Sequence, residues 1–436
     1  MYPDWPESDA DLVPLPQCDG PKLKPFNFQG PQKIEFLEYL GQGLHAHAFK
    51  VKILGQIYAL KLFRFLDDED WKCPENETEI TRDNYNDDRV YLNHNREAMK
   101  AFYNYAEPFS CECRAFGRLQ EAGHEELAIK CFGYVLLDEA HEQTIMTQFS
   151  DLRIEFTGNC EYSGDEYLRS RFLSKDGRVP PIRGIVKELG LKDADETLQA
   201  PLARKILRDI KKLQQLGIMR VDIATRQVMD GKIIDFSMAV TTPHFLTNPE
   251  LNPHLTPEMV SAVELEAFKS CLHDYVDFHI MISDWNLENK GKKRKVSVFP
   301  FPKEDSEDRG WVIEHGLRSK TASTRLYTFV DPRKYDWKAC PASAEASEKE
   351  KTKRRRSGRI LKRGIHENRE AGSSKVRRRL SSKPSMWYYD CDGPLAQHMV
   401  SSPFYPPLRW EYKDGLMFPL IDDEHTYPAY GNSISN

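Results

Sequence analysis

The sequence lacks the features of a secreted or membrane-spanning protein. Its first residues, MYPDWPESDADL, contain neither a basic segment nor an apolar one. No uninterrupted apolar run in the 436 residues is long enough to cross a bilayer. The nine cysteines are scattered and include no Cys-x-x-Cys pair, which indicates reduced thiols rather than a zinc site. We therefore expect a cytosolic or nuclear protein that makes no contact with a membrane.

The composition combines a packed core with solvated segments. Hydrophobic residues make up 40% of the chain, and charged residues make up 30%. The formal net charge of −5 hides an asymmetry, because acidic residues crowd positions 67–88 whereas basic residues cluster after Lys290. The length allows one large domain or two ordinary ones with tails.

Shifts in composition divide the chain into five regions. Prolines in the first region and basic runs in the fourth predict disorder, and the aromatic residues of the fifth predict a segment that packs on the core or binds a partner. The predicted regions are a disordered tail at 1–30, a first lobe at 31–150 with an acidic insertion at 67–90, a second lobe at 151–285, a basic and largely disordered linker at 286–385, and an aromatic C-terminal segment at 386–436.

Strand-like runs dominate the first predicted lobe. Three apolar runs between positions 33 and 65 are separated by glycine-containing turns and predict three antiparallel strands. The runs KCFGYVLL (130–137) and QTIMTQF (143–149) predict two further strands. A short helix, with Ser110 as its N-cap and its end near Gly123, is predicted after the third strand.

Two helices and a hairpin are predicted in the second lobe. One amphipathic helix is expected at 201–217, and another begins at the N-cap Thr256. Between them, Asp222 and Asp235 flank a predicted hairpin whose Asp-Gly turn suits positive φ angles. Both carboxylates should therefore come to the same open end of the hairpin.

This order of elements resembles the protein-kinase-like fold, and three short motifs carry the resemblance. LGQGLHAHAF (40–49) looks like the glycine-rich loop, YALK (58–61) like the lysine-bearing third strand, and IIDFS (233–237) like the Asp-Phe-Gly motif. The implied fold class is α+β with two lobes. A five-stranded antiparallel sheet with one helix forms the first lobe, a reduced helical lobe follows, and a disordered basic region comes last.

The resemblance implies a nucleotide site on the first lobe. Gly41 and Gly43 lack a Cβ atom, so their backbone amides can approach a triphosphate closely. Lys61 matches the lysine that contacts the α and β phosphates, and Glu112 is its expected partner on the predicted helix. The alternatives are an ordinary glycine-containing hairpin and an edge-strand lysine whose ammonium reaches solvent.

The resemblance also assigns roles around the hairpin. Asp222 matches the catalytic aspartate that orients or deprotonates the accepting hydroxyl, and Asp235 matches the aspartate that holds magnesium. Gln227 stands where the family has a magnesium-binding asparagine. ATP and magnesium are thus the implied cofactors. The alternative is a pair of turn aspartates that cap loops.

Several departures from the kinase pattern argue against catalysis. Arg220 and Val221 replace the family's His-Arg, and Ser237 replaces the glycine after Asp-Phe. The longer arm of Gln227 shifts the metal geometry by about one carbon–carbon bond. We therefore expect weak or absent turnover. The enzymatic activity stays open, and so does the alternative that the site binds neither ATP nor magnesium.

Longer segments resemble a more specific family. PQKIEFLEYLGQGLHAHAFKVKILGQIYALKLFRF, PFSCECRAFGRLQEAGHEELAIKCFGYVLLDEAHE and GKIIDFS are similar to a fungal family described as the Fta-two subunit of the Sim-four kinetochore complex. The resemblance spans most of residues 25–285. It implies a place at the centromere, with other kinetochore or chromatin proteins as partners.

Dense basic runs in the predicted linker fit an importin groove or a phosphate backbone. We expect them to direct nuclear import, with nonspecific nucleic-acid contact as a secondary use. The alternative is a solvated linker. The residues expected to carry the import signal are Lys292, Lys293, Arg294, Lys295, Arg354, Arg355 and Arg356.

Three functions are consistent with these patterns. The first is a nuclear, protein-kinase-like scaffold, a pseudokinase of the kinetochore. The second is an active ATP-dependent phosphotransferase that acts on a protein or a small molecule. The third is a nucleic-acid-binding protein that acts through the basic linker.

Overall fold

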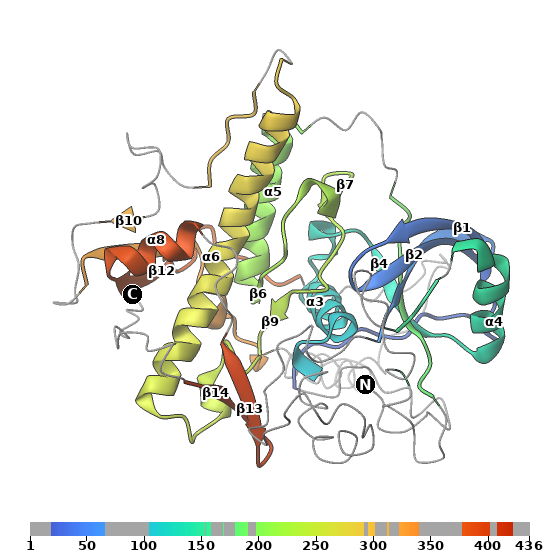
Figure 1. The fold of residues 1–436 in the computed structure, drawn as a ribbon, viewed down its shortest axis with the longest axis horizontal. Helices are drawn as coiled ribbons and strands as arrows, with labels where there is room; N and C mark the ends of the chain where they lie inside the picture. The colour runs from blue at the N-terminus through green and yellow to red at the C-terminus, as the bar shows by residue number, and fades with distance from the viewer. Residues whose placement is uncertain are drawn as a thin grey trace, which may run out of the picture.

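The computed structural model describes residues 19–65, 104–152, 154–157, 169, 179–190, 198–291, 295–300, 312–313, 322–339, 377–401 and 408–421. These residues form an α+β fold, in which helix α3 (Pro108–Ala122) separates a five-stranded sheet from helices α5 (Ala200–Gln215) and α6 (Pro257–Glu288) (Figure 1). None of the helices in these ranges is long and apolar enough to cross a membrane. The predicted acidic insertion at 67–90 lies outside the described residues.

The sheet is antiparallel throughout, with the strand order β1-β2-β3-β5-β4. On one side Phe49 and Leu60 pack with Ile145, and on the other Phe63 and Ile185 join the main core with α3. The two faces are therefore both covered. The strands are β1 (Glu35–Gln42), β2 (Ala46–Ile53), β3 (Gln56–Phe63), β4 (Cys131–Leu136) and β5 (Arg183–Lys187).

The fifth strand is not the one that the sequence predicts. Residues 143–149 fall mainly in helix α4 (Glu139–Gln148), which Asp138 caps by accepting a hydrogen bond from the His141 backbone amide at 2.9 Å. That prediction was wrong because periodicity does not separate a strand from a helix in so short an apolar run. Strand β5 takes the place instead, and all its residues are buried. The sheet therefore extends beyond residue 150, where the sequence predicts the first lobe to end.

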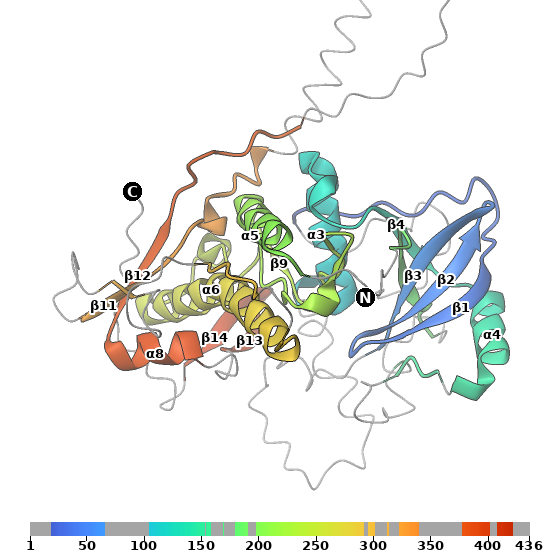
Figure 2. The ribbon, with the colours of Figure 1, turned by 90° about the horizontal axis from the view of Figure 1, so that it is seen from above.

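Helix α3 lies between the sheet and helices α5 and α6 (Figure 2). Its N-cap is Glu107 rather than the predicted Ser110, because the Glu107 carboxylate accepts a hydrogen bond from the Ser110 amide at 3.0 Å. Pro108 then occupies the first turn, where its missing N–H is no disadvantage. The helix ends at Gly123, as the sequence predicts, with a φ of 70°.

The second-lobe elements follow the sequence prediction. Helices α5 (Ala200–Gln215) and α6 (Pro257–Glu288) are both present, and the Thr256 hydroxyl caps α6 by accepting from the Met259 amide at 3.3 Å. Between them lies the hairpin of β7 (Val228–Met229) and β8 (Lys232–Ile233), whose turn residues Asp230 and Gly231 both have positive φ. Strands β6 (Ile218–Met219) and β9 (Val240–Thr241) pair beside it.

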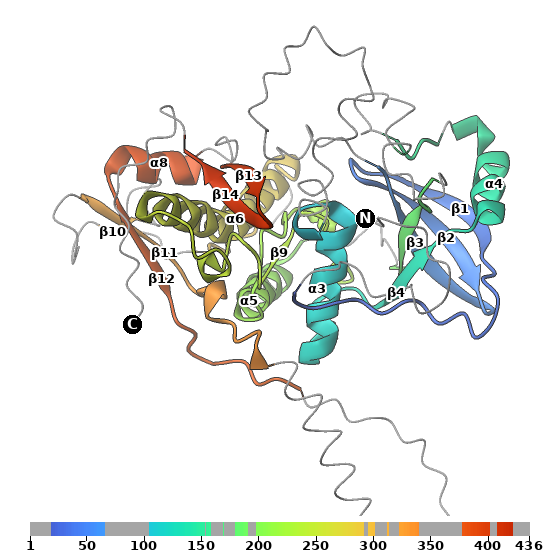
Figure 3. The same cartoon turned by 90° about the horizontal axis from the view of Figure 1, so that it is seen from below.

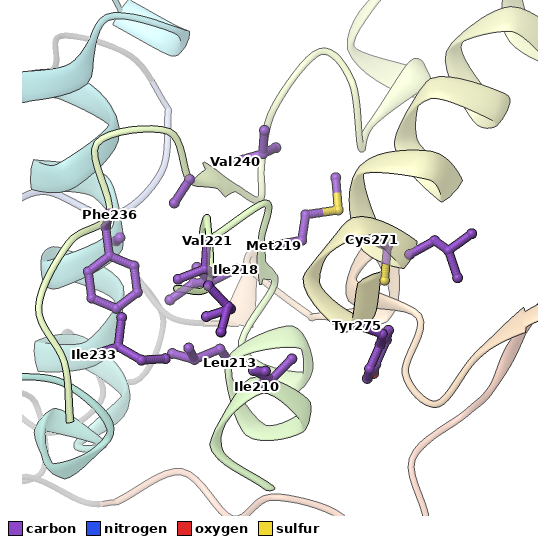
Figure 4. Close-up of a cluster of buried hydrophobic side chains, with 14 of the residues drawn as sticks. Ile210, Leu213, Ile218, Met219, Val221, Ile233, Phe236, Val240, Cys271 and Tyr275 are labelled. Carbon is purple, nitrogen blue, oxygen red and sulfur yellow. The ribbon is translucent and has the colours of Figure 1, made fainter. Parts of the chain in front are cut away.

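One apolar core joins these elements (Figure 4). It fixes the hairpin between α3 and α5, because side chains from the hairpin and from both helices are buried in the same cluster. The side chains labelled in the close-up are Ile210, Leu213, Ile218, Met219, Val221, Ile233, Phe236, Val240, Cys271 and Tyr275.

The aromatic C-terminal segment packs along α6 (Figure 3). The rings of Trp387 and Tyr389 lie 5.1 and 5.2 Å from the ring of Phe268. The described part of the segment therefore completes the core. The elements of the segment are β12 (Trp387–Cys391), α8 (Gly393–Ser401), β13 (Arg409–Lys413) and β14 (Leu416–Leu420). Strand β12 forms a three-stranded sheet with two strands from the predicted linker, β10 (Val312–Ile313) and β11 (Thr324–Thr328).

Candidate functional site

A cavity of about 1150 Å³ lies between the sheet and α6. Its walls are the β1–β2 hairpin, the end of β5, the segment around the β7–β8 hairpin, one face of α6 and the β13–β14 hairpin. Its lining includes all but one of the predicted nucleotide, catalytic and metal residues: Gly41, Gly43, Lys61, Asp222, Gln227 and Asp235, with Glu112 immediately behind Lys61.

Lys61 and Glu112 meet as an ion pair. The Lys61 Nζ lies 2.9 Å from the Glu112 Oε2, and the Glu112 side chain is fully buried whereas Lys61 keeps 16% of its side-chain surface exposed. Strand β3 directs the lysine towards the cavity, and α3 brings the glutamate from behind. The predicted role of this pair towards a nucleotide stays a prediction.

Asp235 joins this pair from the opposite wall. Its Oδ1 accepts hydrogen bonds from the Lys61 Nζ at 2.7 Å and from the Ser237 amide at 2.8 Å. Burial raises the pKa of the Asp235 carboxyl, but the charges of Lys61 and Lys187 outweigh that effect, so its pKa is held well below the usual range. Asp235 is therefore ionised under all ordinary conditions.

Lys187 is a fourth member of the cluster, which sequence reasoning missed. Its Nζ pairs with the Glu112 Oε1 and donates a hydrogen bond to the Ile234 carbonyl at 2.8 Å. It ends the fully buried strand β5. A lysine in the apolar run IVKEL is the signal that could have revealed it, because a buried charge requires a partner.

Two arginines fix the helix that carries Glu112. Arg114 donates to the Thr241 carbonyl at 2.9 Å, and Arg118 donates to the Leu216 carbonyl at 2.8 Å. Both side chains are almost completely buried. Because they tie α3 to the segments around β6 and β9, the position of Glu112 is fixed from the α5 side of the cavity as well as from the sheet.

The glycine-containing hairpin closes one end of the cavity. Gly41 has a φ of 129°, a conformation that requires glycine, and a Cβ at Gly41 or Gly43 would meet no atom within 4 Å. At the tip, the His45 Nδ1 lies 3.1 Å from the Ser237 hydroxyl. Burial and the charge of Lys61 lower the pKa of His45 to about 4, so this histidine is neutral at pH 7.

Asp222 is held more loosely at the other end. Its side chain is 46% exposed, the Arg226 Nη2 lies 3.2 Å from its Oδ2, and the Gln227 Nε2 lies 3.4 Å from the same oxygen. The backbone beside it is fixed, because Asp274 of α6 accepts a hydrogen bond from the Val221 amide at 2.8 Å. The backbone is therefore held in position here, whereas the Asp222 carboxylate is only loosely held.

The predicted magnesium residues, Asp235 and Gln227, already have hydrogen-bond partners in this arrangement. The Asp235 Oδ1 already accepts two hydrogen bonds, one of them from an ammonium group, and the side-chain amide of Gln227 is directed at Asp222. Magnesium requires near-octahedral oxygen ligands at short distance. Within the described residues, no group of three or more His, Cys, Asp or Glu side chains could hold a metal ion.

Helix α6 presents a polar stripe to the cavity at helical spacing: Glu266, Lys269, Ser270, His273 and Asp277. Burial and then the charges of Asp274 and Asp222 raise the pKa of Asp277 to about 7.

The β13–β14 hairpin forms the wall facing this stripe. The ring of Trp410 lies 4.4 Å from that of Phe245, and the Asn252 side chain donates to the Met417 carbonyl at 2.8 Å. The C-terminal segment therefore contributes part of the cavity wall.

The residues expected to carry nuclear import are mostly not described. Lys292, Lys293, Arg294, Arg354, Arg355 and Arg356 lie outside the described ranges. Lys295 is described and exposed, next to Val296, whose backbone amide donates to the Asn286 side chain at 2.8 Å.

A model of one protein family matches this chain. The family is described as kinetochore Sim4 complex subunit FTA2, and the match covers residues 12–240, slightly more than half of the 436 residues. It includes the whole sheet, α3, α5 and the hairpin, and it ends before α6. The match confirms the family resemblance read from the sequence. No curated protein matches the chain.

Proposed function

This chain belongs to the family described as kinetochore Sim4 complex subunit FTA2, and from that membership we propose that it is a nuclear kinetochore subunit that acts as a protein-kinase-like scaffold. The family match carries the kinetochore part of the proposal. Its partners are then other kinetochore or chromatin proteins.

The architecture around the cavity supports the kinase-like part. A five-stranded antiparallel sheet carries a glycine-containing hairpin and Lys61, and a helix after the third strand supplies Glu112. A hairpin between two helices then brings Asp222 and Asp235 to the same cavity. Each of these parts has a counterpart in the kinase-like arrangement that the motifs imply.

The geometry favours a scaffold over an efficient enzyme. A catalytic base must be held within hydrogen-bond reach of the accepting hydroxyl, and small displacements reduce the rate strongly. Asp222 is half exposed and has only long contacts, and Asp235 is engaged by Lys61. The best-ordered part of the site is thus the part that contributes to stability rather than to group transfer.

The kinetochore role is tested by chromatin immunoprecipitation of the tagged full-length chain in its native cells. We expect enrichment at centromeric DNA relative to chromosome arms. A tagged nuclear protein of no kinetochore function serves as the control. Signal equal to that control at the centromere would refute the proposal.

An active phosphotransferase is the second candidate, because Lys61 pairs with Glu112 and Asp222 lines the same cavity. Transfer of labelled γ-phosphate to any acceptor by the purified chain, abolished by Asp222→Ala, would establish it. The scaffold proposal predicts that any residual transfer is the same in the wild type and the variant, as contamination would be.

Nuclear import through the basic runs forms part of the proposal. Alanine in place of Lys292 to Lys295 and of Arg354 to Arg356 should leave a fluorescent fusion in the cytoplasm. Substitution of the exposed Lys50 and Lys52 on β2 provides the control for loss of positive charge alone. An undiminished nuclear signal would show that import uses another signal.

A further inference from the structure

We propose that one face of helix α5, together with the segment 377–383, binds the sugar-phosphate backbone of double-stranded DNA without regard to base sequence. This inference goes beyond the proposed kinetochore role. It uses neither the family match nor the cavity, whose lining contains none of the residues that carry it. The DNA contact can therefore fail while the kinetochore role holds.

The surface begins as a stripe along α5. Three cations and a glutamine follow one another at intervals of four, three and four residues, so they share one face of the helix. They are Arg204, Arg208, Lys211 and Gln215. Arg204 and Arg208 are exposed, whereas the Lys211 ammonium lies 3.4 Å from the centre of the Phe329 ring. At 1.5 Å per residue the stripe is about 16 Å long.

The cations of this stripe differ from those beside it on the same helix. Lys205 and Lys212 both pair with the Asp209 carboxylate, at 2.7 and 3.3 Å. Within the described ranges, neither Arg204 nor Arg208 has a carboxylate partner. The two guanidinium groups are therefore available to an anion from outside the chain.

The segment 377–383 extends the stripe beyond the end of α5 (Figure 2). A backbone hydrogen bond of 2.9 Å ties it to the last residue of α3, and the Ser381 amide donates to the Gln215 Oε1 at 2.8 Å. Because Gln215 is the last member of the stripe, this bond places the segment directly after it. Arg379 and Lys383, on either side of Ser381, are both exposed.

Cations outnumber carboxylates around this segment. Glu126 pairs with Arg377. Asp336 stands between two exposed lysines in the sequence, Lys334 and Lys338, and its backbone carbonyl accepts a hydrogen bond from the segment at 3.0 Å. The surface therefore carries an excess of positive charge, which complements a polyanion.

The chemistry of the exposed groups favours a phosphate backbone over other polyanions. None of the exposed large hydrophobic side chains belongs to α5 or to 377–383, whereas a protein interface has an apolar centre. Neither stretch contains an aromatic residue, whereas proteins that bind single strands stack bases on aromatic rings. Arginine, lysine and serine are common phosphate contacts in duplex DNA. The stripe spans about five phosphates of one strand.

The test is the fluorescence anisotropy of a short labelled duplex of mixed sequence, titrated with the full-length chain at several salt concentrations. A surface variant carries glutamine at four exposed cations. We expect it to bind at least about tenfold more weakly than the wild type and to show a log–log salt slope that is smaller by about 3. The four positions are Arg204, Arg208, Arg379 and Lys383.

A matched control removes the same number of positive charges from the predicted linker, by glutamine at Lys292, Lys293, Arg294 and Lys295. This linker variant should lose much less affinity than the surface variant. Thermal unfolding should give the surface variant the midpoint of the wild type, because exposed substitutions change stability little. Should the surface variant fail to fold, glutamine at Arg204 and Arg208 alone is expected to give about half of the change in salt slope.

Four results would overturn the inference. The first is a wild-type chain that binds no duplex. The second is equal affinity and salt slope for the surface variant and the wild type. The third is a loss in the linker variant as large as that in the surface variant, which would mean that positive charge anywhere in the chain suffices. The fourth is displacement of the duplex by polyglutamate as effectively as by unlabelled duplex of equal charge, which would indicate an acidic peptide as the ligand. All four leave the kinetochore role to the immunoprecipitation experiment.

Discussion

The two ends of the cavity differ in how firmly their charged groups are held. At one end Glu112 is fully buried and shared by Lys61 and Lys187, and Lys61 also bonds Asp235 at 2.7 Å. At the other end Asp222 is 46% exposed, and its nearest polar partners lie 3.2 and 3.4 Å away. At the first end the charged side chains are buried and held by close partners. At the second end the Asp222 carboxylate is half exposed and only loosely held.

This difference distinguishes charged groups that stabilise the fold from the carboxylate that would act in group transfer. Charges taken out of water require close, well-aligned partners, so a buried cluster persists only if all its members are satisfied. An exposed carboxylate carries no such requirement and contributes little to stability. The proposed scaffold role is consistent with this difference, because the carboxylate that would serve as the base is held less firmly than Lys61.

The largest effect is expected at the buried end. Glu112→Gln leaves two buried ammonium groups without their shared carboxylate, and we expect the free energy of unfolding to fall by about 3–5 kcal/mol. Urea denaturation measures this loss. Glu38→Gln, which removes an exposed partner of Lys50 on the same sheet, should change stability by less than about 1 kcal/mol. Equal losses in the two variants would contradict the comparison.

The wall contributed by the C-terminal hairpin should come next. Trp410 is buried and packs on Phe245, so Trp410→Ala should destabilise the chain by about 3 kcal/mol and remove part of the cavity wall. Glu411→Ala, on the opposite face of the same strand, is the matched control. If thermal unfolding gave the same midpoint for both variants, the hairpin would not be part of the core.

At the end that contains Asp222, the free energy of unfolding should depend on pH through Asp277. Burial and the charges of Asp274 and Asp222 raise the pKa of Asp277 from its ordinary value of 3.8 to about 7. Between these values the folded chain holds a proton that the unfolded chain has lost, so this group contributes stability that is lost as the pH rises. The difference in unfolding free energy between the wild type and Asp277→Asn should fall by about 1 kcal/mol per pH unit from pH 5 to pH 7.

The wild type must be compared with Asp277→Asn because other buried groups change the free energy of unfolding with pH in the opposite direction. Burial lowers the pKa of His45 and His273 to about 4, so these residues add stability as the pH rises through the pKa of the unfolded chain. They titrate in both proteins and cancel. Asp284→Asn, at an exposed position on the same helix, serves as the control. A flat difference for Asp277→Asn would place its pKa at the ordinary value.

The smallest effect is expected at Asp222. Because this side chain is half exposed and loosely bonded, Asp222→Asn should change the free energy of unfolding by no more than about 0.5 kcal/mol. Urea denaturation beside Glu112→Gln provides the comparison. A loss as large as that of Glu112→Gln would mean that the two ends are equally organised.

Local signals predicted the parts of the fold that depend on neighbours in sequence. The Asp230-Gly231 turn, the Thr256 cap and the glycine that ends α3 each follow from the backbone preferences of one or two residues. The pairing of Lys61 with Glu112 was expected instead from the kinase-like resemblance, since the two residues are far apart in the chain.

The remaining features depend on tertiary packing. Strand β5 is a short buried run that follows α4, and its pairing with β3 and β4 leaves no periodic signal in the sequence. Residues 143–149, which fall mainly in α4, were predicted as a strand because periodicity does not distinguish a strand from a helix in so short an apolar run. Lys187 can pair with Glu112 only because the sheet brings the two residues together. Trp410 can line the cavity only because the C-terminal segment returns to α6.

The central claim is that this chain serves as a scaffold and not through phosphoryl transfer. The most direct measurement is centromeric enrichment of the chain when its gene carries Asp222→Asn, with protein abundance measured in the same cells. The scaffold account predicts enrichment equal to that of the wild type, because Asp222 contributes neither to the core nor to the proposed role. Loss of enrichment with normal abundance of folded protein would contradict it and would favour an active phosphotransferase.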